Sequence, residues 1–338
     1  MLSRDAGAHL NRRGFIKLAG GAVVVLASGA AIASAIAVYV HGVSVQSEIL
    51  RLALRWFVKG SSLGMPNIAA VRKRIDSLAR IFPRQASDTK SDWLKAGGVA
   101  ALRVTRPESR DHHHVLYLHG GGYVAGSVSH YRDFLWRIAT ATRSHVLCPD
   151  YRLAPEHPFP AAVDDAFTAY RWLLADGADP RHIVMMGDSA GGGLVLATLL
   201  RLRDEGIALP AAAVMLSPWT DLAMSGGSLQ FNAQADPALS PERVRYAAEL
   251  YLAGADPRNP YASPLYGDPT GLPKSLIQVG SDEIQLDDSV RMADKMRAAG
   301  CEVDLQIWTR MPHAWQLFAG YLPESKRAIE QIGAFVQR

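Results

Sequence analysis

The feature that most constrains the fold is a serine flanked by glycines at the junction of a strand and a helix. Gly187-Asp188-Ser189-Ala190-Gly191 follows the apolar run of residues 183–186 and precedes the apolar stretch 194–200. The first run is typical of a buried strand, and the second of a helix packed on it. A serine hydroxyl reacts well only when it is exposed, oriented and served by a base. The sequence therefore predicts a sharp turn that presents Ser189 as a nucleophile.

A second glycine-rich turn lies upstream of the serine. Residues 113–118 form a further predicted strand, which ends in His119-Gly120-Gly121-Gly122-Tyr123. Glycines let the main chain approach closely and turn its N–H groups inward. Attack by a serine on a carbonyl develops negative charge on the carbonyl oxygen, which needs fixed donors. We expect an oxyanion hole formed by the N–H groups of Gly121, Gly122 and Ala190, with His119 holding the loop in shape.

An acid and a base should follow the serine in that order along the chain. Residues 275–279 form a predicted strand, and we expect Asp282, just beyond it, to be the acid. Acidic residues close to it compete for this role; they are Glu283, Asp287 and Asp288, of which the last two are expected on the solvated first turn of a helix. His313 follows the predicted strand 303–308 and is the expected base.

These motifs together resemble those of a known family. The sequence resembles hormone-sensitive-lipase-like carboxylesterases of the α/β-hydrolase fold. The resemblance rests on residues 119–123, the Asp-Tyr-Arg-Leu-Ala-Pro-Glu-His-Pro-Phe-Pro segment 150–160, residues 187–192 and the pair Asp282 and His313. The resemblance extends from about residue 95 to the C-terminus, and within the family it is closest to bacterial acetyl-hydrolases and monoterpene-lactone hydrolases. It implies cleavage of carboxylic esters with short to medium acyl chains, with no metal and no organic cofactor. In the second of these motifs, Arg152 and Glu156 are expected to pair with each other.

The predicted reaction begins when His313 takes the proton of Ser189 during attack on the ester, with Asp282 orienting the imidazole. An acyl-enzyme would form and then be hydrolysed by water. A lactonase or a thioesterase would use the same three residues. A binding protein of the same fold that does no chemistry is an alternative of another class, although such proteins usually lack one of the three.

Seven predicted strands alternate with helical stretches along the chain, and this alternation favours a mostly parallel sheet with helices on both faces. The strands are residues 99–105, 113–118, 145–148, 183–186, 212–216, 275–279 and 303–308. With 338 residues, of which 49% are hydrophobic, the chain can bury one large core. We expect the catalytic α/β-hydrolase domain to comprise residues 91–338.

Two amphipathic segments within residues 41–90 predict cap helices over the acyl pocket. The first has a wide apolar face, and Arg51, Arg55 and Lys59 share the opposite face. Its basic face leaves a position on a membrane surface as the alternative. The second segment has apolar residues at helical spacing between residues 68 and 82. A cap insertion is expected at about residues 225–261, with a helix near residues 241–252.

The N-terminus has the pattern of an export signal. Asn11-Arg12-Arg13-Gly14-Phe15 resembles a twin-arginine motif, and no charged residue occurs in the 23 residues from 18 to 40. Residues 33–35 and 35–37 offer small-residue cleavage sites. This stretch is also long enough to span a bilayer. Residues 1–40 therefore predict a cleaved signal or a membrane anchor, and an exported or envelope-associated bacterial protein.

Charge and composition limit the possible partners. Residues 1–17 carry a net charge of +3, most of the +4 of the whole chain, so nucleic-acid binding is not expected. The two cysteines, Cys148 and Cys301, are too few for a disulfide framework. His112-His113-His114 is expected to lead from a turn into a strand rather than to bind a metal, because adjacent strand residues point to opposite faces.

Overall fold

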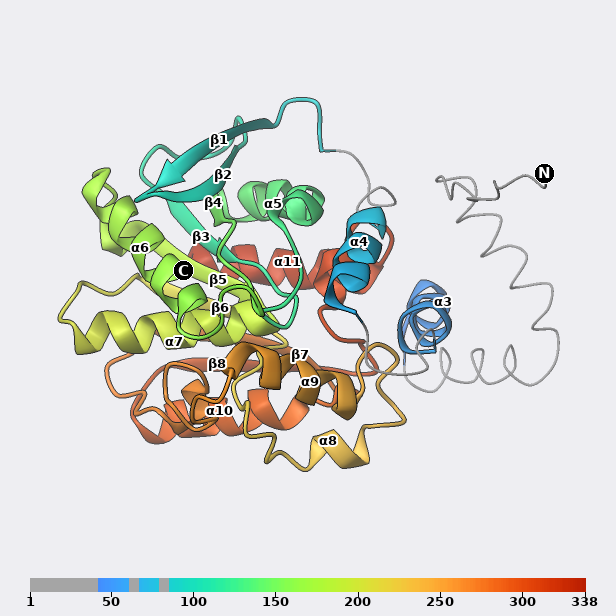
Figure 1. Ribbon diagram of the computed structural model, residues 1–338. Coiled ribbons are helices and arrows are strands. Elements are labelled where there is room, and N and C mark those ends of the chain that lie inside the picture. Colours follow the sequence, from blue (N-terminus) through green and yellow to red (C-terminus); the bar gives the residue numbers. More distant parts are fainter. Residues whose placement is uncertain (1–41, 61–66, 79–84) are drawn as a thin grey trace, which may run out of the picture.

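The structure, a computed structural model, describes residues 42–60, 67–78 and 85–338. Its centre is an eight-stranded sheet with the strand order β1-β2-β4-β3-β5-β6-β7-β8 (Figure 1). Strand β2 runs antiparallel to both of its neighbours, β1 and β4, and every other pair of adjacent strands is parallel. The strands are β1 Lys90–Ala96, β2 Val99–Thr105, β3 His114–Leu118, β4 His145–Pro149, β5 Ile183–Asp188, β6 Ala212–Leu216, β7 Lys274–Gly280 and β8 Val303–Trp308.

All seven predicted strands are present, so the expected mostly parallel sheet is confirmed. The sequence reading missed β1, which forms a hairpin with β2 at the edge of the sheet. This strand is largely polar and exposed, and the Trp93 side chain on it is half in solvent. Unlike the predicted strands, β1 has no clear apolar pattern, which is why it was not predicted.

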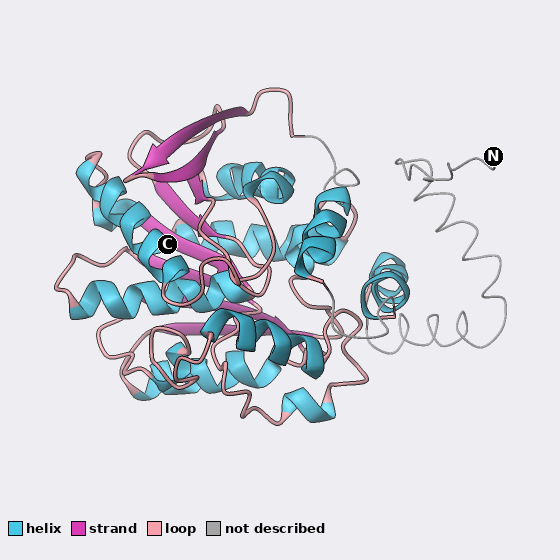
Figure 2. Cartoon of the chain, in the orientation of Figure 1, coloured by secondary structure: helices cyan, strands magenta, loops and turns pink. Residues whose placement is uncertain are grey.

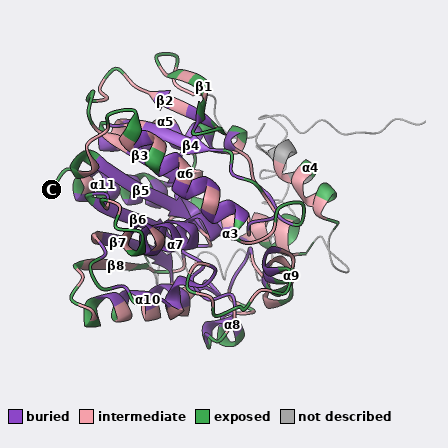
Figure 3. Ribbon diagram, turned by 60° about the vertical axis from the view of Figure 1, so that its left-hand side comes forward, coloured by how far each residue is buried: buried purple, intermediate pink, exposed green. Residues whose placement is uncertain are grey.

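Helices cover both faces of the sheet, and Figure 2 shows the layers. Side chains along each central strand alternate between two cores: on β3, Leu116 and Leu118 join the core beneath α6, α7 and α10, whereas Val115 and Tyr117 join the core beneath α5 and α11. The central strands β3 to β7 are almost wholly buried (Figure 3). The covering helices are α5 Val128–Thr142, α6 Ala161–Ala175, α7 Ala190–Asp204, α10 Leu286–Ala298 and α11 Pro323–Val336.

The remaining helices lie beyond the end of the sheet where the parallel strands terminate (Figure 1). The expected helix near residues 241–252 is present as α9, and the two N-terminal amphipathic segments form α3 with η1, and α4. These elements are α3 Val45–Leu54, the π-helical η1 Arg55–Lys59, α4 Ile68–Leu78, α8 Ser228–Phe231 and α9 Pro241–Leu252. The short 3-10 turns are η2 Pro180–His182, η3 Pro264–Tyr266 and η4 Trp315–Phe318.

The first N-terminal helix presents a different face from the one expected. Arg51 is buried against the body of the protein, and Arg55 and Lys59 also donate hydrogen bonds to it. Trp56 and Phe57 instead face solvent, with 72% and 55% of their surfaces exposed. The expectation that the apolar face packs inward is therefore wrong for η1, because backbone carbonyl groups of residues 233–236 accept the cationic side chains.

The predicted signal or anchor, residues 1–40, lies outside the described residues. Within the described ranges, the helices are all too short or too polar to cross a membrane.

Candidate active site

Ser189 occupies a strained turn between β5 and α7. Its backbone has φ 55° and ψ −124°, a conformation that residues other than glycine rarely adopt. The turn is held from β6, because the Ser189 N–H donates to the Leu216 carbonyl at 2.8 Å. The Ser189 carbonyl in turn accepts from Trp219 N–H at 2.9 Å and from Gly193 N–H at 3.1 Å. Such strain persists only where the surroundings fix the backbone, and here they present a half-buried serine at the end of the strand.

The glycine after this turn is needed for close packing. A Cβ atom on Gly191 would overlap the carbonyl oxygens of Leu118 and His119. These two residues end β3 and begin the glycine loop 119–123. The absence of a side chain on Gly191 therefore lets the N-terminus of α7 lie directly against the loop that was expected to bind the oxyanion.

Asp188, the residue before the serine, joins the two parts of the site. Its carboxylate accepts hydrogen bonds from the Tyr117 hydroxyl at 2.7 Å, the Tyr131 hydroxyl at 2.9 Å and the Gly120 N–H at 3.0 Å. Asp188 is buried, and this burial raises the pKa of its carboxyl above the ordinary value. Its structural function is to hold the glycine loop at a fixed position beside the nucleophile turn.

The three expected oxyanion donors lie on the glycine loop 119–123 and at the first residue of α7. Gly121 and Gly122 have φ values of 127° and 64°, which favour glycine. The Gly120 N–H is already used by Asp188 and Tyr131. In the described part of the chain, the N–H groups of Gly121, Gly122 and Ala190 donate to no other group. A substrate oxygen at the N-terminus of α7 would also benefit from the positive end of the helix dipole.

His119 supports the loop, as expected. Its ring stacks on Tyr151 with a centroid separation of 4.3 Å, and its Nδ1 lies 2.8 Å from the Gly120 carbonyl oxygen. Burial lowers the pKa of His119, which favours the neutral imidazole. The Tyr151 hydroxyl donates to the His119 carbonyl at 2.6 Å. These contacts tie the loop to the segment that follows β4.

The expected base is found with an acid, but not with the expected one. His313 Nδ1 lies 2.7 Å from Glu283 Oε2, and the Glu283 side chain is fully buried. Asp282 forms no hydrogen bond or ion pair with His313; its Oδ2 accepts a 2.7 Å hydrogen bond from Arg51 instead. The expected pairing of Asp282 with His313 is therefore wrong, and Glu283 occupies the place beside His313. The two residues are adjacent on one turn, and their side chains leave it in different directions.

Two further donors hold Glu283 in place. Its Oε1 accepts from the Ser217 hydroxyl at 2.7 Å and from the Gly280 N–H at 2.6 Å. Ser217 follows β6, has φ 48°, and also accepts from the Ala314 N–H at 3.2 Å. The sequence reading missed Ser217. Ser217 directly follows the predicted strand 212–216, which lies between the strands that precede Ser189 and Glu283. This position could have indicated that Ser217 lies near the site.

The environment of His313 favours its charged form. Burial by itself would lower its pKa, but the hydrogen bond and the charge of Glu283 outweigh burial and raise the pKa above 6.5. This is the arrangement in which a carboxylate orients an imidazole and stabilises its imidazolium form. The parallel strands β5, β7 and β8 bring Ser189, Glu283 and His313 to the same end of the sheet.

Two other expectations about acidic residues are wrong. Arg152 and Glu156 do not pair with each other: Arg152 binds Asp165 on α6 at 2.8 Å, and Glu156 binds Arg72 on α4 at 2.7 Å. Each finds its partner on a helix rather than within the loop.

Asp288 is also buried rather than solvated. It accepts from the N–H groups that follow β6, and burial raises its pKa to about 7.

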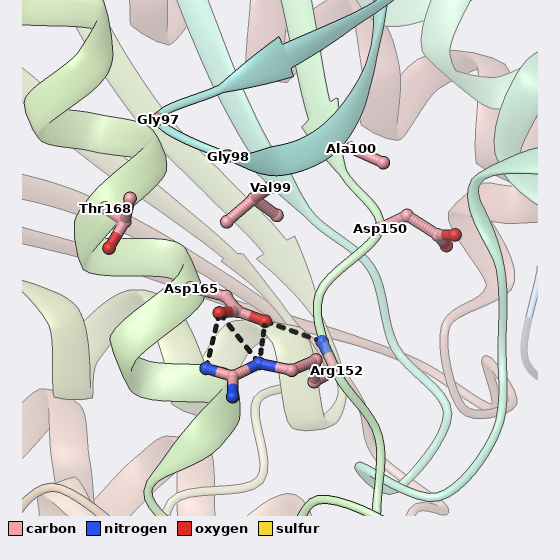
Figure 4. A pocket seen from close by; sticks show the side chains of 8 residues that line it. All are labelled: Gly97, Gly98, Val99, Ala100, Asp150, Arg152, Asp165 and Thr168. Atoms are coloured by element: carbon pink, nitrogen blue, oxygen red, sulfur yellow. Dashed lines mark hydrogen bonds and ion pairs between the residues drawn. The ribbon is translucent and has the colours of Figure 1, made fainter.

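A pocket of about 330 Å³ lies elsewhere, between the β1–β2 hairpin, the end of β4 and α6 (Figure 4). The Arg152–Asp165 ion pair lies on its wall. Neither the serine nor the histidine and glutamate of the candidate site line this pocket, so we assign it no part in the chemistry.

The fold and the serine turn are those of an α/β hydrolase, and comparison with known proteins identifies the same class. Residues 115–317, more than half of the chain, match the family model described as alpha/beta hydrolase fold. The chain belongs to this family, and its relatives place it among the bacterial hormone-sensitive-lipase-like esterases. The expected fold and family are thus confirmed.

Particular relatives are similar over most of the chain. An acetyl-hydrolase of Streptomyces hygroscopicus is 47% identical over 240 residues, which are 71% of this chain and 80% of the relative. An esterase of Acinetobacter venetianus is 36% identical over 79% of this chain and 88% of its own. A crystal structure of an esterase from the bacterial hormone-sensitive lipase family is 45% identical with a TM-score of 0.83, covering 87% of this chain and 98% of that chain.

Proposed function

We propose that this protein is a serine hydrolase that cleaves carboxylic esters with short to medium acyl chains. The observation that carries the proposal is the 2.7 Å contact of His313 with the buried Glu283, at the end of the sheet where β5 presents Ser189. A lone histidine has no preferred orientation, whereas one bound through Nδ1 to a buried carboxylate can direct Nε2 at a nucleophile.

The proposed reaction has two halves. His313 takes the Ser189 proton as the serine oxygen attacks the ester carbonyl, and Glu283 stabilises the imidazolium. The N–H groups of Gly121, Gly122 and Ala190 bind the oxyanion. His313 then gives its proton to the departing alcohol, which leaves an acyl group on Ser189. Water, activated by His313, attacks the acyl-enzyme in the same way and releases the carboxylic acid.

The limit on acyl-chain length is supported by what surrounds the oxyanion loop. A Cβ on Gly122 would lie 3.4 Å from the Cβ of Ala247, so α9 packs close to this loop. Tyr123 stacks on Tyr251 of α9 with a centroid separation of 3.8 Å. One similar relative is named an acetyl-hydrolase, and a similar solved structure was soaked with p-nitrophenyl butyrate.

The experiment is a rate comparison on p-nitrophenyl esters from acetate to dodecanoate, with purified protein and the Ser189→Ala variant. We expect hydrolysis that is fastest at short to medium chain length, and loss of about 10³-fold or more in the variant. Equal rates for the two proteins would contradict an enzymatic function. Parallel assays on a lactone and a thioester identify a lactonase or a thioesterase, if either is cleaved faster than the esters.

We also propose that residues 1–40 direct export or anchor the protein at the cell envelope. The paired Arg12 and Arg13 ahead of the uncharged stretch 18–40 support this. Fractionation of cells expressing the full chain, beside a variant with both arginines changed to lysine, tests it. We expect the variant to be retained in the cytoplasm, and equal distribution of the two proteins would contradict the proposal.

A further inference from the structure

A buried arginine on the N-terminal helix contacts the turn that holds Glu283 and the loop that holds His313. The Arg51 guanidinium, whose side chain is 5% exposed, donates to Asp282 Oδ2 at 2.7 Å and to the Arg310 carbonyl at 2.8 Å. It also reaches the Ala235 carbonyl at 3.4 Å. Burial of a charged group is costly unless it is paired and hydrogen-bonded, and here Arg51 is satisfied by groups from three separate segments.

A second ion pair runs the other way between the same elements. Glu48, one turn before Arg51 on α3, accepts hydrogen bonds of 2.9, 3.0 and 3.1 Å from the Arg310 guanidinium. Ser281 closes the network, because its hydroxyl donates to Asp282 at 2.9 Å and accepts from the Arg310 N–H at 2.9 Å. Helix α3 therefore binds both turns through ion pairs: Arg51 pairs with Asp282, and Glu48 pairs with Arg310.

We propose that Arg51 is a positioning residue for the acid and base of the triad, an inference that rests on the proposed function. Asp282 immediately precedes Glu283, and Arg310 lies three residues before His313. By binding Asp282 and the Arg310 carbonyl together, Arg51 fixes the spacing of the two turns and so keeps Glu283 in contact with His313. The Arg51 side chain forms no hydrogen bond or ion pair with Ser189 or with the oxyanion loop, so it acts through these turns.

The structure provides a matched control for simple loss of helix docking. The start of α3 is held by Glu324 on α11, which accepts from the Ser44 N–H at 2.7 Å and from the Ser44 hydroxyl at 2.9 Å. Glu324 is as well buried as Arg51. It anchors the same helix but contacts neither turn of the triad. The two anchors should therefore have separable effects on catalysis.

The first test compares Arg51→Ala and Glu324→Gln in the full-length protein with p-nitrophenyl acetate. We expect Arg51→Ala to lower kcat about tenfold with KM changed less than threefold, because the acid and base are misplaced while substrate binding is retained. Glu324→Gln should keep kcat within about twofold of the wild type. An unchanged kcat in Arg51→Ala, or equal losses in the two variants, would overturn the proposal.

The second test is independent of esterase activity. The pKa of His313, measured by NMR titration of its imidazole protons, should fall in Arg51→Ala toward 6.5 and stay at the wild-type value in Glu324→Gln. A His313 pKa that is the same in wild type and Arg51→Ala would overturn the positioning role. An inactive wild type with the expected shift would instead contradict the proposed function while leaving the positioning role supported.

Arg51→Lys and Asp282→Asn serve if Arg51→Ala does not fold. Lysine keeps the charge but cannot reach all three acceptors at once, so a partial loss of kcat of about threefold is expected. Asp282→Asn should lower kcat by a similar factor, and the double variant Arg51→Lys, Asp282→Asn should lose less than the product of the single losses, because the two residues act through one contact. If the loss of kcat in the double variant equalled the product of the two single losses, the two residues would act independently and the coupling would be contradicted.

Discussion

Ser217 donates a 2.7 Å hydrogen bond to Glu283, on the carboxylate oxygen opposite the one that contacts His313. This contact ties the end of β6 to the acid carried after β7. We expect Ser217→Ala to lower kcat about five- to tenfold, because Glu283 loses a donor and Ala314 N–H loses its acceptor. The measurement is steady-state hydrolysis of p-nitrophenyl acetate, with Ser225→Ala as a control on a distant hydroxyl. A wild-type kcat in Ser217→Ala would contradict the role.

Replacement of Glu283 separates the corrected acid from the one first expected. Glu283→Gln keeps the side-chain shape but removes the charge that stabilises the imidazolium of His313. We expect kcat to fall by about 10³- to 10⁴-fold, against a far smaller loss in Asp282→Asn. The reverse order of the two losses would restore Asp282 as the acid.

The pH dependence of the reaction follows from the same pair. The base must be neutral to accept the serine proton, and Glu283 raises the pKa of His313 above 6.5. The rate constant kcat/KM of the wild type should therefore rise with pH through a midpoint above 6.5. In Glu283→Gln the midpoint should move to lower pH, because the imidazolium loses its stabilising anion. If the midpoint of the kcat/KM profile were the same in both proteins, a group other than His313 would control the rise of the rate with pH.

Asp188 should matter for stability as well as for activity. Asp188→Ala leaves the Tyr117 and Tyr131 hydroxyls without their buried acceptor, whereas the Gly120 N–H keeps its hydrogen bond to the Tyr131 oxygen. Unsatisfied buried groups cost about 1–3 kcal/mol each, so we expect the free energy of unfolding to fall by at least about 2 kcal/mol. Denaturant unfolding measures this. Asp256→Ala, a change at an exposed turn, should leave the midpoint unchanged, and equal midpoints for wild type and Asp188→Ala would contradict the account.

Asp288 predicts a pH dependence of stability. Burial raises its pKa in the folded state to about 7, above its ordinary value of 3.8. Between these values the folded state binds more protons than the unfolded state, so this group makes the free energy of unfolding fall as pH rises, by up to about 1.4 kcal/mol per pH unit. Unfolding measured at pH 4 to 8 should show a shallower decline for Asp288→Asn than for wild type. Parallel curves would contradict this.

The sheet and the nucleophile could be predicted because local patterns specify them. Apolar runs marked every strand buried on both faces, and glycines around Ser189 marked the turn. The acid could not be assigned in this way. Asp282 and Glu283 are neighbours of similar chemistry, and their functions are separated only by contacts from Arg51, 231 positions away, and from Ser217.

The first N-terminal helix shows a similar limit. Its apolar and basic faces were visible in the sequence, but periodicity alone did not reveal that carbonyl groups of residues 233–236 would accept Arg55 and Lys59. A charged face packs inward only where the body supplies acceptors. Those acceptors come from a segment distant in sequence, so the orientation of this helix depends on the tertiary structure.

Covalent labelling identifies directly which serine is the nucleophile. A fluorophosphonate reacts with an activated serine, and peptide mass spectrometry identifies the modified residue. We expect one adduct, on Ser189, formed at least about 10²-fold more slowly in His313→Ala. An adduct on another serine, or equally fast labelling of Ser189 in both proteins, would contradict it.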